Sequence, residues 1–144
     1  MKRTLIIGLA LVVAAAGAAA AAVAGQDAPE ATGGCIQPVS WDGWLAAKVK
    51  AEEHDAAGNL VAALQYYLEY TRQAQGLNNP ARVAWGKNNS AYMIIKMHRQ
   101  DPTVDLTPAG KLLEDGLAVV GATDDCRKVL EMNLLHVKGC LGRT

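Results

Sequence analysis

Apolar residues recur at three-to-four spacing in five separate stretches of the chain, and turn-forming residues separate the stretches. This period is that of an amphipathic helix. The expected helices span about 44–57, 60–76, 81–99, 107–120 and 124–138. No run alternates apolar and polar residues between hairpin turns, as a half-buried strand would. The pattern therefore predicts an all-α fold of about five antiparallel helices with short connections.

The breaks between these stretches carry residues that end or begin helices. Gly58 follows the first helix and supplies the left-handed residue that turns the chain back. Gly76 and the Asn-Asn-Pro run at 78–80 end the second helix. Thr107 is expected to cap the fourth helix and Pro108 to fill its first position. Asp124 or Asp125 is expected to cap the fifth helix, and Gly139 to stop it.

The N-terminus has the composition of an export signal. Lys2 and Arg3 precede an apolar segment, and Ala22-Val23-Ala24 places small residues before a cleavage point. Residues 1–24 are therefore predicted to be a signal peptide, 25–40 a flexible leader and 41–144 the helical domain. The alternative is an uncleaved anchor, because 4–24 is just long enough to span a bilayer. Cleavage would place the protein in the periplasm or outside the cell.

Net charge excludes one class of partner. Lys+Arg and Asp+Glu number 14 each. Without Lys2 and Arg3 the balance is 12 against 14, or about −2. No basic block or stripe remains, so nucleic-acid binding is not expected.

The chain has three cysteines: Cys35, Cys126 and Cys140. If a single disulfide forms after export, one thiol stays unpaired. Cys126 and Cys140 flank a helical segment about 20 Å long, too far apart to pair directly. Cys35 could reach either one, so a disulfide of Cys35 with Cys126 or with Cys140 is predicted. The alternative for Cys35 is lipid modification. No cysteine spacing fits zinc or haem, and no cofactor or metal is expected.

Residues 44–138 resemble tetratricopeptide repeats, which are helix-turn-helix units of 34 residues. Small residues at helix crossings, the turn and the following aromatic carry the resemblance in the first unit, and Trp and Ala-Tyr positions carry it in the second. These repeat positions are Trp44, Ala51, Gly58, Ala63, Tyr67, Trp85, Ala91 and Tyr92. The resemblance implies a short α-solenoid. The long 100–107 connection and the absence of phenylalanine leave an irregular helical bundle as the alternative.

The tyrosine cluster and the Glu-Glu-His-Asp run at 52–55 have ordinary explanations. Tyr67 and Tyr70 are expected to share a packed face, whereas Tyr66 lies off it and is a candidate for partner contact. His54 points away from the carboxylates, so the run is expected to be a solvated helix end. No nucleophile, phosphate loop or carboxylate pair is identifiable, so the chain is not expected to be an enzyme.

The resemblance implies that a protein or peptide binds in a short concave groove. Lys48, Lys87, Asn88 and Asn89 are the candidates to line it, because amide and amino groups can hold a ligand's backbone or carboxylate. The alternative is a self-assembling envelope or extracellular structural component, a homo-oligomer that uses the repeat as a scaffold. Membrane contact is expected only if the N-terminal segment stays uncleaved or Cys35 is lipidated.

Overall fold

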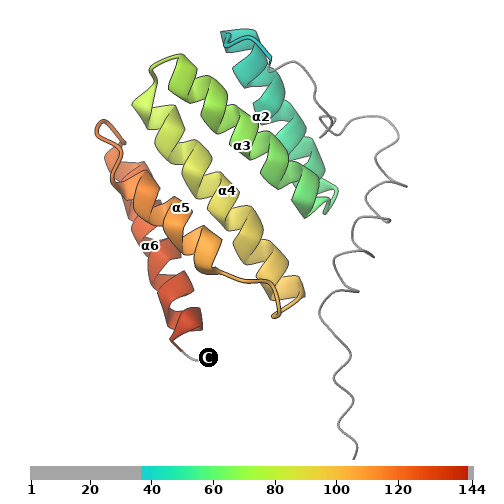
Figure 1. Cartoon of the computed structure of the whole chain (residues 1–144), viewed down its shortest axis with the longest axis vertical. Coiled ribbons are helices and arrows are strands. Elements are labelled where there is room, and N and C mark those ends of the chain that lie inside the picture. The colour runs from blue at the N-terminus through green and yellow to red at the C-terminus, as the bar shows by residue number, and fades with distance from the viewer. Residues whose placement is uncertain (1–36, 143–144) are drawn as a thin grey trace, which may run out of the picture. The chain divides into compact units, whose positions relative to one another are not determined.

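Helices form the whole ordered framework of residues 37–142, the part of the chain that the structure, a computed structural model, describes (Figure 1). Those residues contain no strand, which confirms the all-α prediction. The predicted signal peptide, most of the leader and Cys35 lie outside the described residues. The helices are α2 (Trp41–Ala56), α3 (Leu60–Gly76), α4 (Pro80–Gln100), α5 (Thr107–Leu117) and α6 (Asp124–Leu141).

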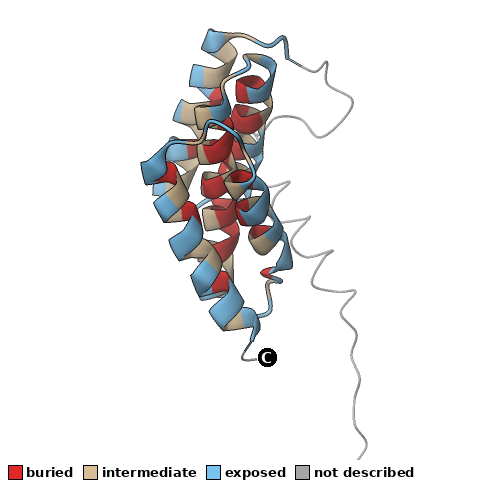
Figure 2. Ribbon diagram, turned by 90° about the vertical axis from the view of Figure 1, so that its left-hand side faces the viewer, coloured by how far each residue is buried: buried red, intermediate tan, exposed pale blue. Residues whose placement is uncertain are grey.

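Each helix packs against the next one along the chain, and α4 also packs against α6. Figure 1 shows α2, α3 and α4 side by side, with α5 and α6 on the far side of α4. α4 is therefore the central helix, and its buried positions run from Val83 to Ile95. The inward faces of all five helices carry the buried residues, and the outward faces are exposed (Figure 2).

Two apolar clusters meet at α4, where Tyr92 and Met97 pack against both. The larger one joins α4, α5 and α6 through residues such as Ile95, Leu113 and Leu130. The smaller one joins α2, α3 and α4, and it contains Ala51, Leu60, Ala63, Tyr67 and Met93.

The small residues of the first predicted repeat lie at helix contacts. Ala51 and Ala63 have no exposed surface, and Tyr67 reaches from α3 to Met93 of α4. Short side chains allow close approach of two helices, and the aromatic ring fills the space beside them. In the second unit Ala91 is also fully buried.

Positive φ angles occur in three turns of the described chain, at Gly58, Asn78 and Gly121. Gly58 has φ of +77°, as the sequence predicted, a conformation that glycine adopts with less strain than residues with a Cβ. In the next turn the left-handed residue is Asn78, with φ of +52°, while Gly76 is the last residue of α3. Asparagine tolerates this region better than most residues do.

The start of α2 differs from the prediction. The helix begins at Trp41, not Trp44, because the Ser40 hydroxyl accepts a hydrogen bond from the Gly43 amide at 2.9 Å. Both tryptophans therefore lie inside the helix.

The ends of α5 and α6 differ as well. Thr107 does not cap α5: the Asp105 carboxylate accepts a hydrogen bond from the Thr107 amide at 2.8 Å, and the helix stops at Leu117. Thr123, not Asp124 or Asp125, caps α6 by accepting a hydrogen bond from the Cys126 amide. α6 also continues through Gly139 to Leu141, since a helix can accommodate glycine at modest cost.

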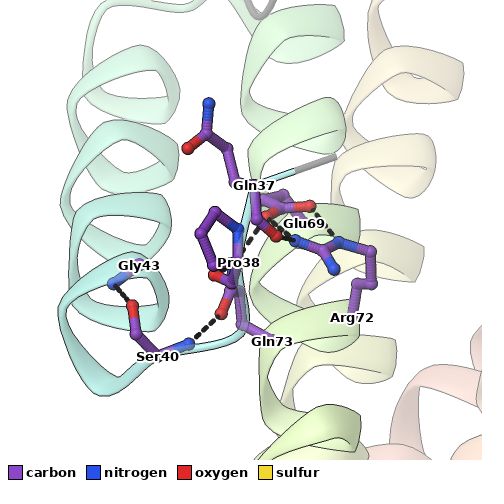
Figure 3. A network of polar contacts seen from close by, with 7 residues as sticks. All are labelled: Gln37, Pro38, Ser40, Gly43, Glu69, Arg72 and Gln73. Carbon is purple, nitrogen blue, oxygen red and sulfur yellow. Dashed lines mark hydrogen bonds and ion pairs between the residues drawn. The ribbon is translucent and has the colours of Figure 1, made fainter. Parts of the chain in front are cut away.

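Residues 37–40, the end of the predicted leader, are fastened to α3 by the side chain of Gln73 (Figure 3). Its Oε1 accepts a hydrogen bond from the Ser40 amide at 2.9 Å. Its Nε2 donates to the Pro38 carbonyl at 3.1 Å and to the Glu69 carboxylate at 3.0 Å. Gln73 is fully buried, so this network, which we call the Gln73 latch, satisfies the amide while it fixes the chain ahead of α2.

Arg72 strengthens the latch from outside. Its guanidinium binds both carboxylate oxygens of Glu69 and donates to the Gln37 carbonyl at 2.7 Å. The hydrogen bond from Arg72 is the largest cause that lowers the pKa of Glu69. The carboxylate is therefore held in the ionised form that accepts the Gln73 hydrogen bond.

Candidate functional site

One side of α4 carries a stripe of half-buried aromatic and polar residues between α2 and α6. Trp85, Asn89, Tyr92 and Lys96 follow at spacings of four, three and four, so they share one side of the helix. Trp85 and Tyr92 pack their inner edges on the larger apolar cluster. We call these four residues the α4 stripe.

Three asparagine amides join the α4 stripe to α6. Asn133 of α6 donates from Nδ2 to Asn88 Oδ1 at 2.9 Å, and Asn88 Nδ2 donates to Asn89 Oδ1 at 3.3 Å. Asn88 is buried, whereas Asn89 and Asn133 are half-exposed. We call this group the amide cluster.

The amide cluster has hydrogen-bonding capacity left at its two ends. An asparagine offers two N–H donors and an oxygen with two acceptor sites. Within residues 37–142, the Asn89 NH₂ group and the Asn133 oxygen are engaged in no side-chain hydrogen bond. A donor and an acceptor held on one surface match the carbonyl and N–H of an extended peptide backbone.

The C-terminal end of the α4 stripe is fixed to α2. Lys96 Nζ binds the Asp55 carboxylate at 2.6 Å and lies 5.3 Å from the centre of the Tyr92 ring. Arg99 extends toward the same ring, at 5.9 Å. Two cations therefore flank Tyr92: Lys96, whose charge Asp55 balances, and Arg99, whose charge favours contact with anionic or polar ligand groups.

The N-terminal end of α4 is bridged to α2 by aromatic contacts. The Arg82 guanidinium lies 3.9 Å from the Trp44 ring centre and 4.8 Å from that of Trp41. Trp44 also packs against Tyr70, at 5.1 Å between ring centres. The two tryptophans thus form one contact of α2 with α3 and α4, and Trp44 is half-buried.

The predicted contact residues separate into two groups. Asn88 and Asn89 belong to the amide cluster, but Lys87 does not join them. Residues two apart are rotated by about 200° around a helix, so their side chains point to nearly opposite sides. Lys87 accordingly faces α5, where its Nζ is 3.8 Å from Asp115 and its side chain is 17% exposed.

The remaining two candidates lie on the first helix pair. Lys48 binds Glu52 at 2.7 Å on α2. Tyr66 stacks on the His54 ring, with centres 5.4 Å apart, and is half-buried. The structure brings neither of them to the amide cluster.

Sequence reasoning missed Asn133, although its position carried a signal. Cys126, Leu130 and Val137 are the buried residues of α6, and Asn133 falls on the same stripe at spacings of three and four. A polar residue in an apolar stripe needs a hydrogen-bonding partner. That partner is Asn88, which lies 45 positions earlier in the chain.

Tyr67 and Tyr70 are both buried, as predicted, and burial raises both pKa values. The pKa of Tyr67 rises to about 12, through burial first and then through the nearby Asp55 and Glu52 carboxylates. These phenols therefore stay protonated near neutral pH and act as packing groups. Neither is exposed enough to serve as a surface acid or base.

The cysteines and acidic residues form no ligand set in the described part of the chain. Residues 37–142 contain no group of three or more His, Cys, Asp or Glu side chains that could hold a metal ion. Cys126 is fully buried, and this burial raises the pKa of its thiol, whereas Cys140 is half-exposed beside His136. Cys35 lies outside the described residues, so its disulfide stays a prediction. None of the helices between 37 and 142 is both long and apolar enough to cross a membrane.

The chain matches no protein-family model, and no curated protein or solved structure is significantly similar to it.

Proposed function

We propose that this chain is an exported, tetratricopeptide-like interaction module that binds an extended peptide segment of a partner protein. It would act by binding rather than by catalysis. The observation that carries the proposal is the amide cluster, in which a buried asparagine holds two half-exposed asparagines on the surface that α4 shares with α6.

Three properties of this surface support peptide binding. The donor of Asn89 and the acceptor of Asn133 are oriented by hydrogen bonds, so little conformational entropy is lost when a ligand binds. Trp85 and Tyr92 flank Asn89 at spacings of four and three, and they offer apolar contact area. Arg99 places positive charge at one end, beside the Lys96–Asp55 pair, which fits an acidic side chain or a C-terminal carboxylate.

A displayed library of random peptides tests the proposal. The protein is expected to select peptides, and the best of these is synthesised and measured by calorimetry. Asn89→Ala and Asn133→Ala are each expected to weaken binding about tenfold, the effect of one lost hydrogen bond of roughly 1.4 kcal/mol.

Asn59→Ala is the matched control, because Asn59 is an exposed asparagine in the α2–α3 turn whose side chain caps no helix. It should bind like the wild-type protein. Selection of no peptide, or equal affinity of Asn89→Ala, Asn133→Ala and wild type, would refute the assignment.

A further inference from the structure

Met132 and Leu135 are large apolar side chains that the fold leaves in solvent. They are 68% and 74% exposed and lie on α6. The buried residues of this helix, among them Leu130 and Val137, are on its other side. The exposed pair therefore takes no part in the core of the described chain.

Met132 and Leu135 belong to a longer stripe with the spacing of a helix-pairing seam. The stripe alternates steps of three and four residues and is exposed along its whole length. Its members are Asp125, Lys128, Met132, Leu135, Gly139 and Gly142. Such spacing keeps one face of a helix directed toward a second helix. We call these six positions the α6 seam.

We propose that α6 pairs with α6 of a second copy of this chain, in antiparallel orientation, across a two-fold axis between Met132 and Leu135. The sizes of the seam residues favour this partner. Met132 would face Leu135 of the second copy, and the long Lys128 would face the second copy's Gly139. In the described part of the chain, a methyl group added at Gly139 meets nothing within 4 Å, so internal packing does not require this glycine.

Charge also favours the antiparallel orientation. In a parallel pair Lys128 would face Lys128 and Asp125 would face Asp125, which is repulsive. The antiparallel pair instead places these charged ends against Gly139 and Gly142. It also brings Glu131 beside Lys138 of the second copy, because both lie on the same flank of the seam. Glu131 and Lys138 are about 10 Å apart along one helix and cannot bind each other within a chain. Within the chain Lys138 instead binds Glu114 of α5 at 3.3 Å, and because both side chains are more than half exposed, Lys138 can exchange this partner for Glu131 of the second copy.

The expected interface is small. α6 has 18 residues and is therefore about 27 Å long. One helix pair buries less than the roughly 800 Å² per partner of a standard stable interface. The dimer should accordingly be weak and dependent on concentration. Asn133 points toward α4, away from the seam, so pairing leaves the amide cluster accessible and does not depend on the proposed function.

Sedimentation velocity of the expressed protein, with its N-terminus defined by mass spectrometry, tests the pairing between about 5 and about 500 µM. The expected result is a monomer–dimer equilibrium without larger species. Leu135→Lys should raise the dissociation constant at least about thirtyfold, because the two-fold symmetric interface contains the substitution twice and loses the leucine contact at both positions. A monomer at every concentration would overturn the proposal.

The control for a different assembly is Leu45→Lys on the exposed apolar face of α2, where Leu45 is 52% exposed. This variant should dimerise like the wild type. If it abolishes association instead, copies stack head to tail through α2 and the proposal is wrong.

A charge exchange tests the orientation. All charge variants carry Glu114→Gln, which removes the intrachain partner of Lys138. In this background Glu131→Lys should weaken the dimer about fivefold, and the double variant Glu131→Lys/Lys138→Glu should restore it. Failure of the double variant to recover affinity would exclude the antiparallel register. Circular dichroism of each variant shows whether the monomer is still folded.

Discussion

Replacing Gln73 by methionine should detach the segment ahead of α2 and destabilise the whole domain. Methionine has nearly the same length and volume but no hydrogen-bonding amide. The substitution removes the bonds to Ser40, Pro38 and Glu69 at 2.9, 3.1 and 3.0 Å. Neutral hydrogen bonds contribute about 0.5–1.5 kcal/mol each, and a bond to a charged group about 1.5–3.

The sum is reduced because water can reach parts of the network after the change. The Ser40 amide is only part-buried and Pro38 is exposed, so both find solvent partners. We therefore expect a loss of about 3 kcal/mol, a large share of the 5–15 kcal/mol typical of a domain. In urea, with a slope near 1.5 kcal/mol per molar, the midpoint should fall by about 2 M.

Urea unfolding followed by circular dichroism measures this loss, and Gln75→Met is the matched control. Gln75 is an exposed glutamine of the same helix, so its replacement should change stability by less than about 0.5 kcal/mol. If Gln73→Met is no less stable than Gln75→Met, the latch contributes no net stability and the reasoning fails. Hydrogen exchange at the Ser40 amide gives a second readout and should accelerate only in the Gln73 variant.

Three further changes test other parts of the structure. Gly86→Ala should destabilise the domain by about 2–3 kcal/mol in urea unfolding, because the added methyl would overlap Thr71 Oγ1 of α3. Unchanged stability would show that α3 and α4 can separate freely. Arg72 lowers the pKa of Glu69, so this carboxylate stabilises the fold above its unfolded-state pKa, and the stabilisation is lost as pH falls through its folded-state pKa. Urea unfolding from about pH 6 to pH 3 should therefore show a smaller loss of stability in Glu69→Gln than in the wild type. An identical pH profile in the two proteins would contradict this. Burial raises the pKa of the Cys126 thiol, so iodoacetamide should label this thiol far more slowly in the folded than in the urea-unfolded protein. Peptide mapping measures the two labelling rates, and equal rates would mean that the site of Cys126 opens readily.

The helices were predictable from sequence because their breaks are chemically distinct. Gly58 and the Asn-Asn-Pro run at 78–80 mark two turns that the structure contains. Helix starts were harder to place, because Thr123, Asp124 and Asp125 are all good caps and only the geometry shows which oxygen receives the Cys126 amide.

The candidate site was only partly predictable, because sequence does not say which helix covers each side of α4. Lys87 and Asn89 are two positions apart, yet one meets α5 and the other lies on the α4 stripe. The periodicity of α4 shows these opposite directions, but α6 must be placed before Asn88 can be joined to Asn133. That pairing is a tertiary contact, and no local pattern contains it.

The two bridges between α2 and α4 have a mechanical consequence. α2 packs on α3, and besides Ala51 in the smaller apolar cluster it reaches α4 through Trp41 and Trp44 on Arg82 at one end and Asp55 on Lys96 at the other. Two fastenings at opposite ends of a helix fix its crossing angle, because rotation in either direction must stretch at least one of them. Both bridges involve a cation, so dissolved salt weakens them more than it weakens the apolar core. The angle between α2 and α4 is therefore expected to change with ionic strength.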